Sequence, residues 1–321
     1  MGGGYKVYFS NSGAEAVEGA VKLAKYATER PAIIAFKGSF HGRTMMCTSL
    51  TASNSAYRKH YEGLVPSIYF AEYPKLFGTP YKMEDGKCPK QYFTQFDDIF
   101  KRLVDPYSVA AILMEPVQGE GGVHPATQEF MTGLREFCDE NGMLLLIDEV
   151  QTGWCRTGAV MSYMNYGIKP DIVSMAKGLG GGMPIGAICA TEEVAKAFTP
   201  GSHGTTFGGH PVSCAAAYAE VGELLDRDLA GNAKKMGDYF SEKLAKMPHV
   251  KEVRHQGLLV GVEFDDAVSG VEVKHACLDR KLLITAIGAH TIRMVPPLIV
   301  NEEQCDKAVE IITEAVEAVA K

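Results

Sequence analysis

The feature that most constrains the fold is a series of short apolar segments that alternate with longer amphipathic ones. Residues 109–114, 143–147 and 172–176 are apolar almost throughout. A strand without alternation of polar and apolar residues is buried on both faces, as the strands of a helix-covered parallel sheet are. An intervening segment, 130–137, carries its large apolar residues at helical spacing. The pattern predicts an α/β fold whose central sheet is mostly parallel and flanked by helices.

The N-terminal part continues this alternation. Short strands are expected at 7–10 and 33–36, with a helix over 17–24 between them. Residues 72–100 contain three prolines and two glycines. These residue types interrupt regular structure, so this segment is expected to be an irregular surface excursion.

The last third of the chain has a different pattern. Residues 213–246 are expected to be mostly helical, short strands follow around 258–264 and 292–295, and the chain closes with an amphipathic helix. We therefore expect two domains. Residues 1–212 form the large domain, and residues 213–321 form a connecting helix and a smaller C-terminal α+β domain.

Composition narrows the classes of function. The 321 residues include 39 acidic and 32 basic side chains, a formal net charge of −7. This lack of a basic surplus argues against binding to nucleic acid or to an anionic membrane surface. No apolar run approaches the roughly 18 residues of a membrane span, and no signal peptide is visible at the start. The chain is expected to be cytoplasmic.

The eight cysteines are spaced too widely for a metal site or a redox motif. No two of them lie within four residues of each other, which excludes the short-spaced pairs of zinc ribbons and redox proteins. They are expected to be reduced, and most of them to lie in the core. No metal is predicted.

Residues that follow the predicted strands carry the chemistry, because open parallel sheets place their sites at the carboxyl ends of strands. After the first strand, Asn11 or Ser12 begins a helix whose free N–H groups suit a phosphate. Asp148 follows another strand and is either a local cap or the partner of a buried cation. Lys177 follows a third strand and precedes a run of glycines. It is either a surface lysine or a nucleophile toward carbonyls.

Together these three anchors suit pyridoxal 5'-phosphate (PLP). A lysine forms a Schiff base with PLP, a carboxylate pairs with its pyridinium nitrogen, and a helix N-terminus holds its phosphate. The glycines follow Lys177, whereas those of a P-loop precede the lysine. A nicotinamide dehydrogenase is a poor alternative, because no glycine fingerprint follows the first strand and Met183 replaces the last glycine of a G-x-G-x-x-G pattern.

Seven segments carry a resemblance to one family. They are NSGAEAVEGAVKLA at 11–24, SFHGRT at 39–44, EPVQGEGGV at 115–123, IDEVQTG at 147–153, AKGLGGGMPIGA at 176–187, GTTFGG at 204–209 and RMVPPL at 293–298. In this order they resemble the class III (ornithine-type) PLP-dependent aminotransferases of fold type I. The resemblance covers nearly the whole chain and implies a PLP-binding large domain.

The resemblance implies a role for each residue around the cofactor ring. Lys177 would form the aldimine with PLP and would be the proton shuttle for the 1,3-proton transfer. Asp148 would bind the pyridinium nitrogen. Gln151 would reach the ring hydroxyl, and Phe40 would stack on the ring.

The phosphate contacts are implied in the same way. Ser12, Gly13 and Ala14 would contact the phosphate of the same subunit. Thr206 would donate to the phosphate bound by a partner subunit, with Thr205 as the nearby alternative. This role implies an obligate homodimer with its active sites at the interface.

The substrate contacts are also implied by the resemblance. Arg43 would pair with a substrate carboxylate, as a guanidinium fork can. Arg293 would hold the second carboxylate of 2-oxoglutarate, and Glu120 would cover Arg293 when an amine substrate is bound. His41 is expected to support the site indirectly. Glu115 is interpreted as either structural or functional and is left out of the catalytic set.

The sequence departs from the family pattern in two ways. Only ten residues precede the first motif, whereas family members carry a longer segment that contributes to the small domain, the dimer interface and the substrate pocket. Trp154 and Cys155 replace a small or apolar residue followed by glycine, and His210 replaces the usual asparagine. A side chain at position 155 is strained if the backbone there has positive φ.

These observations predict an aminotransferase that transfers an amino group from an ω-amine donor to 2-oxoglutarate by a ping-pong mechanism. The glycine and threonine motifs resemble those of acetylornithine aminotransferases, so acetylornithine or an ornithine-like donor is placed first. The 72–100 segment resembles that of 4-aminobutyrate transaminases, which keeps 4-aminobutyrate or another ω-amino acid as the alternative. A third hypothesis is a chain that binds PLP with impaired catalysis, because the preceding segment is missing.

Overall fold

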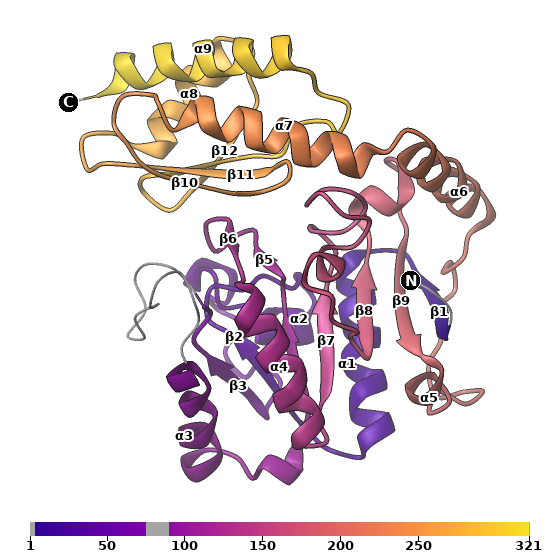
Figure 1. Ribbon diagram of the computed structural model, residues 1–321. Helices are drawn as coiled ribbons and strands as arrows, with labels where there is room; N and C mark the ends of the chain where they lie inside the picture. The colour runs from indigo at the N-terminus through magenta and orange to yellow at the C-terminus, as the bar shows by residue number, and fades with distance from the viewer. Residues whose placement is uncertain (1–3, 75–89, 321) are drawn as a thin grey trace. The chain divides into compact units, whose positions relative to one another are not determined.

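The structure, a computed structural model, describes residues 4–74 and 90–320 (Figure 1). The chain divides into two compact units. The large unit comprises Met1–Pro116, Ala126–Gln151 and Tyr163–Glu223. The small unit comprises Val117–Pro125, Thr152–Ser162 and Leu224–Lys321. The predicted division into residues 1–212 and 213–321 stays a prediction.

A seven-stranded sheet forms the centre of the large unit, in the order β1-β9-β8-β7-β4-β2-β3. Its strands are β1 (Tyr5–Ser10), β2 (Ala32–Phe36), β3 (Ile68–Ala71), β4 (Val109–Met114), β7 (Leu144–Asp148), β8 (Ile172–Met175) and β9 (Gly186–Thr191). Only β9 runs antiparallel to its neighbours, β1 and β8. The remaining pairs are parallel, which confirms the predicted fold class.

Helices cover both faces of this sheet, as its uninterrupted apolar strands require (Figure 1). They are α1 (Gly13–Thr28), α2 (Met45–Leu50), α3 (Thr94–Arg102), α4 (Gln128–Glu140) and α5 (Glu192–Ala195). Helix α6 (Pro211–Asp226) follows β9 in the chain, and its last turn belongs to the small unit. The buried face of α1 packs on Ile33 and Leu146. On the opposite face, Phe130 of α4 contacts Phe36 edge to face.

The expectation of an irregular segment over 72–100 is wrong for its last part. Residues 94–102 form α3, and residues 75–89 of the segment lie outside the described residues. Phe93, Phe96 and Phe100 recur at helical spacing, and their rings contact that of Phe137 on α4. Burial of these rings outweighs the turn signals of the prolines and glycines that precede them.

The small unit contains a four-stranded antiparallel sheet in the order β10-β11-β13-β12. Its strands are β10 (Val250–Gln256), β11 (Leu259–Phe264), β12 (Thr285–Ile287) and β13 (Thr291–Met294). Helices α7 (Leu229–Leu244), α8 (Gly270–Asp279) and α9 (Glu302–Val319) lie on one face of it (Figure 1). Phe240 and Leu244 of α7 share a core with Ile312 of α9, which agrees with the predicted helical pattern.

A short hairpin completes the small unit. It consists of β5 (Val117–Gln118) and β6 (His124–Pro125), which pair antiparallel. The hairpin carries Glu120 in its turn. It therefore brings part of the EPVQGEGGV motif to the small unit, although this motif stands in the middle of the predicted large domain.

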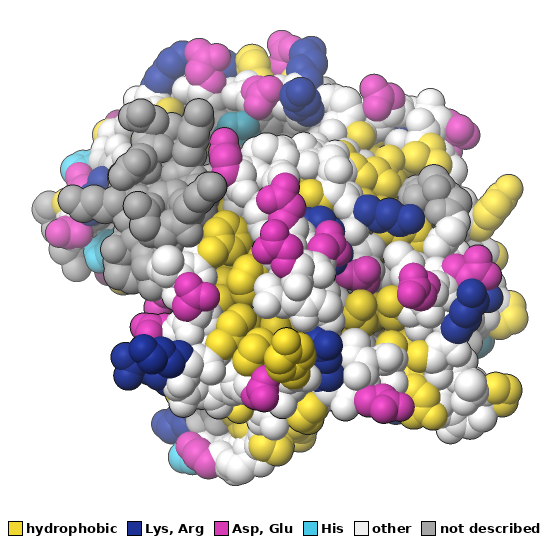
Figure 2. Space-filling view, turned by 60° about the horizontal axis from the view of Figure 1, so that its bottom comes forward, with side chains coloured by type: hydrophobic (Ala, Val, Ile, Leu, Met, Phe, Trp, Pro, Cys, Tyr) yellow, Lys and Arg dark blue, Asp and Glu magenta, His cyan; other side chains and the backbone are white. Residues whose placement is uncertain are grey.

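The surface agrees with the charge composition. Figure 2 shows a face on which acidic and basic side chains are interspersed rather than gathered into a basic patch. Within residues 4–74 and 90–320, every helix is too short or too polar to span a lipid bilayer.

Gly186 offers a test of how tightly β9 and the start of α1 are packed. A Cβ at this position would lie 2.2 Å from the carbonyl oxygen of Ser12. We expect Gly186→Ala to lower the free energy of unfolding by about 1–3 kcal/mol, because the backbone before α1 must move. Urea unfolding followed by circular dichroism measures the change. Gly222→Ala is the control, since its Cβ meets nothing within 4 Å; equal effects of the two would contradict this account.

Candidate active site

The ends of β1, β7 and β8 lie at one edge of the large sheet, because these three strands run in the same direction. Gly13, at the start of α1, connects them. A Cβ on Gly13 would lie 2.7 Å from Cγ1 of Val150 and 3.6 Å from Cβ of Ala176. The turn after β1 therefore contacts the residues that follow Asp148 and precede Lys177. The three predicted anchors converge as the strand topology implies.

The N-terminus of α1 is open to an anion. Ser12 is the N-cap, and its side chain accepts a hydrogen bond of 3.2 Å from the N–H of Glu15. The side chain of Glu15 in turn accepts from the backbone N–H of Asn11. In the described part of the chain, the N–H groups of Gly13 and Ala14 donate to no protein acceptor. These groups and the helix dipole favour a phosphate here.

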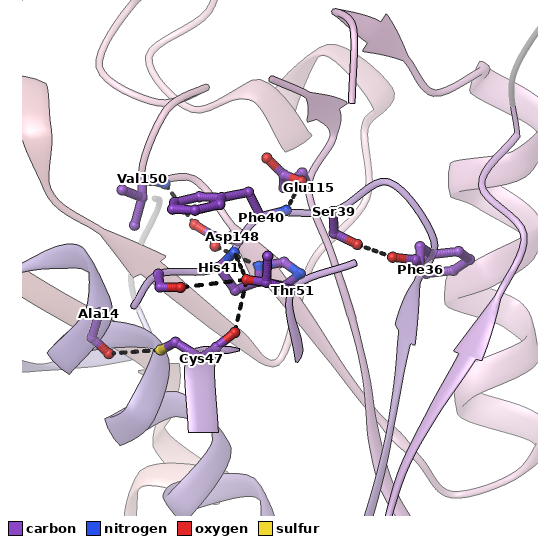
Figure 3. Close-up of polar contacts among 11 residues, drawn as sticks. Ala14, Phe36, Ser39, Phe40, His41, Cys47, Thr51, Glu115, Asp148 and Val150 are labelled. Carbon is purple, nitrogen blue, oxygen red and sulfur yellow. Dashed lines mark hydrogen bonds and ion pairs between the residues drawn. The ribbon is translucent and has the colours of Figure 1, made fainter. Parts of the chain in front are cut away.

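Asp148 is a buried carboxylate at the end of β7, with 4% of its surface exposed. Its Oδ1 accepts a hydrogen bond of 2.9 Å from the N–H of Val150. Its Oδ2 lies 2.8 Å from Nδ1 of His41 (Figure 3). An ionised carboxylate can accept about four hydrogen bonds, so Asp148 keeps the capacity to accept one from a ligand N–H.

His41 is held in place by its own backbone. Its N–H donates to Oγ1 of Thr51 at 3.0 Å, and Thr51 Oγ1 donates to the carbonyl of Cys47 at 2.8 Å (Figure 3). Because a carboxylate only accepts, Nδ1 of His41 carries the proton of the bond to Asp148. The sequence predicted a supporting role for His41 but not this partner, since residues 41 and 148 belong to different motifs.

Cys47 lies beside this network as a neutral thiol. Burial raises its pKa to about 12, and its Sγ donates to the carbonyl of Ala14 at 3.4 Å (Figure 3). A protonated Cys47 adds no second negative charge near the buried carboxylate of Asp148.

Lys177 begins the short 3-10 turn η5 (Lys177–Gly180) directly after β8, and its side chain is exposed. Its φ is 44°, a left-handed conformation that costs a non-glycine residue about 1–2 kcal/mol. The glycines after it form a close turn, because a Cβ on Gly180 would lie 2.6 Å from Cγ2 of Ile185. Strain of this kind persists where the surroundings impose it, which is common at functional sites.

Phe40 and Arg43 form an aromatic and cationic cluster with Tyr57. The backbone N–H of Phe40 donates to the buried carboxylate of Glu115 at 3.1 Å. The guanidinium of Arg43 lies 3.9 Å from the ring centroid of Tyr57 and 5.5 Å from that of Phe40. Sequence reasoning missed Tyr57, because the residues around it match no motif. Glu115 contacts the backbone that positions Phe40.

Thr205 and Thr206 differ in their contacts. Oγ1 of Thr205 accepts hydrogen bonds from Asn11 Nδ2 at 3.1 Å and from the N–H of Gly208 at 3.2 Å. Thr206 is exposed and, in the described part of the chain, has no such partner. Of the two threonines, the structure therefore leaves Thr206 available for a contact outside the subunit.

Gln151 also lies in the large unit and is half-buried.

The small unit holds the other two predicted substrate residues together. Nη2 of Arg293, on β13, lies 2.8 Å from Oε1 of Glu120 in the β5–β6 turn. Arg293 is 8% exposed, and its Nε and Nη1 have no partner in the described residues. The Arg293 guanidinium therefore keeps the capacity to donate further hydrogen bonds.

Position 155 has the positive φ at which a side chain was expected to be strained. The φ angles of Trp154 and Cys155 are 56° and 69°. Cys155 is buried against Leu224 and Leu229 in the small unit. The next residue, Arg156, is bonded to the carbonyls of Leu258 and Pro296, and burial lowers its pKa to about 10.

Comparison with known proteins identifies the family. The model of the class III aminotransferases matches residues 1–316. Acetylornithine aminotransferase of Caldanaerobacter subterraneus subsp. tengcongensis is 42% identical over an alignment of 319 positions, which covers 96% of this chain and 75% of that protein. The chain belongs to the class III aminotransferases.

Solved structures agree with this assignment of the aminotransferase. Ornithine aminotransferase of Toxoplasma gondii is 30% identical, with a TM-score of 0.85 over 98% of this chain and 73% of that one. An amine transaminase of an uncultivated Pseudomonas species, in a PLP-bound form, is 28% identical, with a TM-score of 0.90 over 98% of this chain and 77% of that one.

The family confirms the predicted enzyme class and cofactor, since class III aminotransferases depend on PLP. The residues of this aminotransferase fit that group. They offer a carboxylate with unused acceptor capacity, an open helix N-terminus and a lysine, all at one sheet edge.

The contact between His41 and Asp148 is testable in the cofactor-free aminotransferase. We expect His41→Leu to lower the free energy of unfolding by about 1–3 kcal/mol, because it leaves a buried carboxylate with one protein donor fewer. His41→Asn retains an N–H donor on the atom next to Cγ and is expected to lose less. Urea unfolding measures both. Equal losses would show that packing, not the bond to Asp148, accounts for the effect.

Proposed function

We propose that this aminotransferase transfers the amino group of acetylornithine, or of an ornithine-like donor, to 2-oxoglutarate in two successive half-reactions. The observation that carries the proposal is the pair formed by Arg293 and Glu120. Arg293 would bind a substrate carboxylate, and the carboxylate of Glu120 would occupy Arg293 when no substrate carboxylate is bound. The relative from Caldanaerobacter, named acetylornithine aminotransferase, supports the choice of donor.

Arg293 would bind the second carboxylate of 2-oxoglutarate. Once Glu120 leaves, Nη2 and the unused Nε or Nη1 form a planar fork that suits a carboxylate. Glu120 is only partly buried, with 26% of its side chain exposed. It can therefore leave Arg293 for solvent when a dicarboxylate arrives and return when the ligand is an amine donor. This exchange would let one group serve both half-reactions.

Residues of the large unit would hold PLP. Asp148 would accept a hydrogen bond from the pyridine nitrogen, with its other side fixed by His41. Gly13, Ala14 and the Ser12 cap would bind the phosphate. When bound, PLP supplies an electrophilic carbon and an electron sink.

The proposed catalytic base is Lys177. Its amine would bind the cofactor covalently. Once the donor has displaced it, the amine would act as the shuttle for the 1,3-proton transfer. Lys177 is exposed and follows β8, at the sheet edge that also carries Asp148. Phe40 would stack on the ring, and Gln151 would reach its hydroxyl group.

Arg43 would bind a substrate carboxylate. Its guanidinium is oriented by the rings of Tyr57 and Phe40, and no carboxylate in the described residues pairs with it. Cation–π contacts hold the fork without using its N–H donors. Arg43 therefore keeps those donors for a ligand.

We propose that the active form is a homodimer in which Thr206 binds the phosphate of the partner subunit's cofactor. Support comes from exposed apolar residues in the same region of the large unit. Phe207 is 66% exposed, and Tyr218 on α6 is 86% exposed. Apolar groups so exposed in one region are typical of an interface.

A cytoplasmic location is part of the proposal. The described cysteines are free thiols: Cys47, Cys138, Cys155, Cys189, Cys214, Cys277 and Cys305. Free thiols are typical of a reducing compartment.

A spectroscopic test follows from the role of Lys177. The purified protein is incubated with PLP, and its visible absorption is recorded before and after adding acetylornithine, ornithine or 4-aminobutyrate. We expect acetylornithine to bleach the band of the lysine-bound cofactor, and Lys177→Ala to lack that band. Bleaching by 4-aminobutyrate instead would favour the alternative donor. A band that no donor bleaches would indicate a PLP-binding chain with impaired catalysis.

The proposed role of Arg293 can be tested by substitution, with the two half-reactions measured separately. We expect Arg293→Gln to raise the KM for 2-oxoglutarate about 10- to 100-fold, because one or two charge-assisted hydrogen bonds are lost. The donor half-reaction, measured separately by the loss of visible absorption, should change far less. A similar loss in both half-reactions would contradict a role for Arg293 in binding the second carboxylate.

A further inference from the structure

A second buried arginine lies in the same row of the small sheet as Arg293. Arg254 of β10 is the register partner of Gly261 on β11, and Gly261 is the partner of Arg293 on β13. Side chains at directly opposed positions project from the same face of a sheet. The row therefore consists of two arginines separated by a residue without a side chain.

The two arginines are equally buried but differ in their partners. Arg254 is 7% exposed, and its Nη1 is bonded to the carboxylates of Glu252 and, at 2.7 Å, of Glu263. Its Nε donates to the carbonyl of Gly122 at 2.9 Å. Arg293 has two donors without a partner in the described residues. Arg254 is thus bonded within the protein, whereas Arg293 keeps donor atoms that no group of the described residues uses.

The bond from Arg254 Nε reaches the hairpin that carries Glu120. Gly122 and Val123 of this hairpin lie directly over Gly261. A Cβ on Gly261 would lie 2.9 Å from Cβ of Val123 and 3.1 Å from the carbonyl oxygen of Gly122. The absence of a side chain at 261 therefore lets the hairpin backbone approach the sheet.

The hairpin is held in a strained conformation. Val123 has a φ of 56°, which is rare for a β-branched residue, and Gly122 has a φ of 116°. Val123 is fully buried against Val117 and Leu259. Strain of this kind persists only where the surrounding contacts impose it. Here the contacts include this apolar cluster and the bond from Arg254.

We propose that Arg254 and Gly261 are positioning residues that seat the 117–125 hairpin so that Glu120 reaches Arg293. The seat fixes the hairpin backbone, and Glu120 leaves or covers Arg293 by rotation of its side chain alone. The position of the hairpin determines how often Glu120 occupies Arg293. Arg254 and Gly261 thereby set the preference between a dicarboxylate and an amine donor. This inference rests on the proposed function of Arg293 and Glu120.

Gly261→Ala tests whether the close approach of the hairpin to Gly261 positions Glu120, and it changes no charge. The φ of Gly261 is not positive, so alanine is strained only by the hairpin above it. We expect the variant to lift the hairpin, weaken the contact of Glu120 with Arg293 and bind glutarate about three- to tenfold more tightly than the wild type. Titration calorimetry with glutarate, an unreactive dicarboxylate, measures this on the PLP-loaded protein. The kcat/KM of the donor half-reaction should fall, and that of the 2-oxoglutarate half-reaction should not.

A double-mutant cycle separates positioning from general damage. In a Glu120→Ala background, Gly261→Ala should leave glutarate affinity unchanged, because the group it displaces is gone. Arg254→Lys, which keeps a positive charge for Glu252 and Glu263 but loses the Nε donor, should change the wild type in the same direction as Gly261→Ala. Gly222→Ala, with open space around its Cβ, is the matched control, and thermal melting monitors folding.

Two results would overturn the inference. One is an equal effect of Gly261→Ala with and without Glu120, or equal losses in both half-reactions. The other is a failure of glutarate to bind both the wild type and Glu120→Ala, since Arg293 would then not be an anion site. Failure of the proposed function is distinct from both: the wild type would not react with the donor or with 2-oxoglutarate, whereas glutarate binding and its dependence on Glu120 would still be measurable.

Discussion

The site in the large unit depends on the close packing of Gly13 between Val150 and Ala176. This contact joins the end of β1 to the ends of β7 and β8. More than a hundred residues separate β1 from these two strands in the sequence. Because Gly13 lacks a side chain, the N-terminus of α1 lies close enough for its free N–H groups to share one edge of the sheet with Asp148 and Lys177. Any larger residue there would move the helix away from the other two anchors.

A glycine allows a similarly close approach in the small unit. Gly261 lets the 117–125 hairpin approach the antiparallel sheet, as Gly13 lets α1 approach the parallel one. In each case a missing Cβ brings a polar backbone within reach of charged side chains. The two units thus use glycine to position groups that act on anions: an open helix N-terminus in one, and the pair of Arg293 and Glu120 in the other.

Much of this arrangement could be predicted from the sequence. The uninterrupted apolar segments give the parallel strands, and the residues after them give Asp148 and Lys177, since strand direction alone brings those positions together. Contacts between distant motifs could not be predicted. His41 meets Asp148, and Arg254 reaches Gly122, only because tertiary packing brings them together. Helix α3 was missed because its phenylalanines follow a segment rich in prolines, and β9 because its small residues resemble the glycine turn before it.

The strained pair Trp154 and Cys155 has a consequence for how this chain can be observed. Trp154 is the single tryptophan among 321 residues, and it stands three residues after Gln151 and six after Asp148. Six residues of extended chain span about 20 Å at most, so the backbone of Trp154 lies within about that distance of the backbone of Asp148 in any conformation of the protein. A cofactor that absorbs near the emission of indole should quench this one fluorophore. The chain therefore carries an intrinsic optical reporter of cofactor loading, uncomplicated by emission from a second tryptophan.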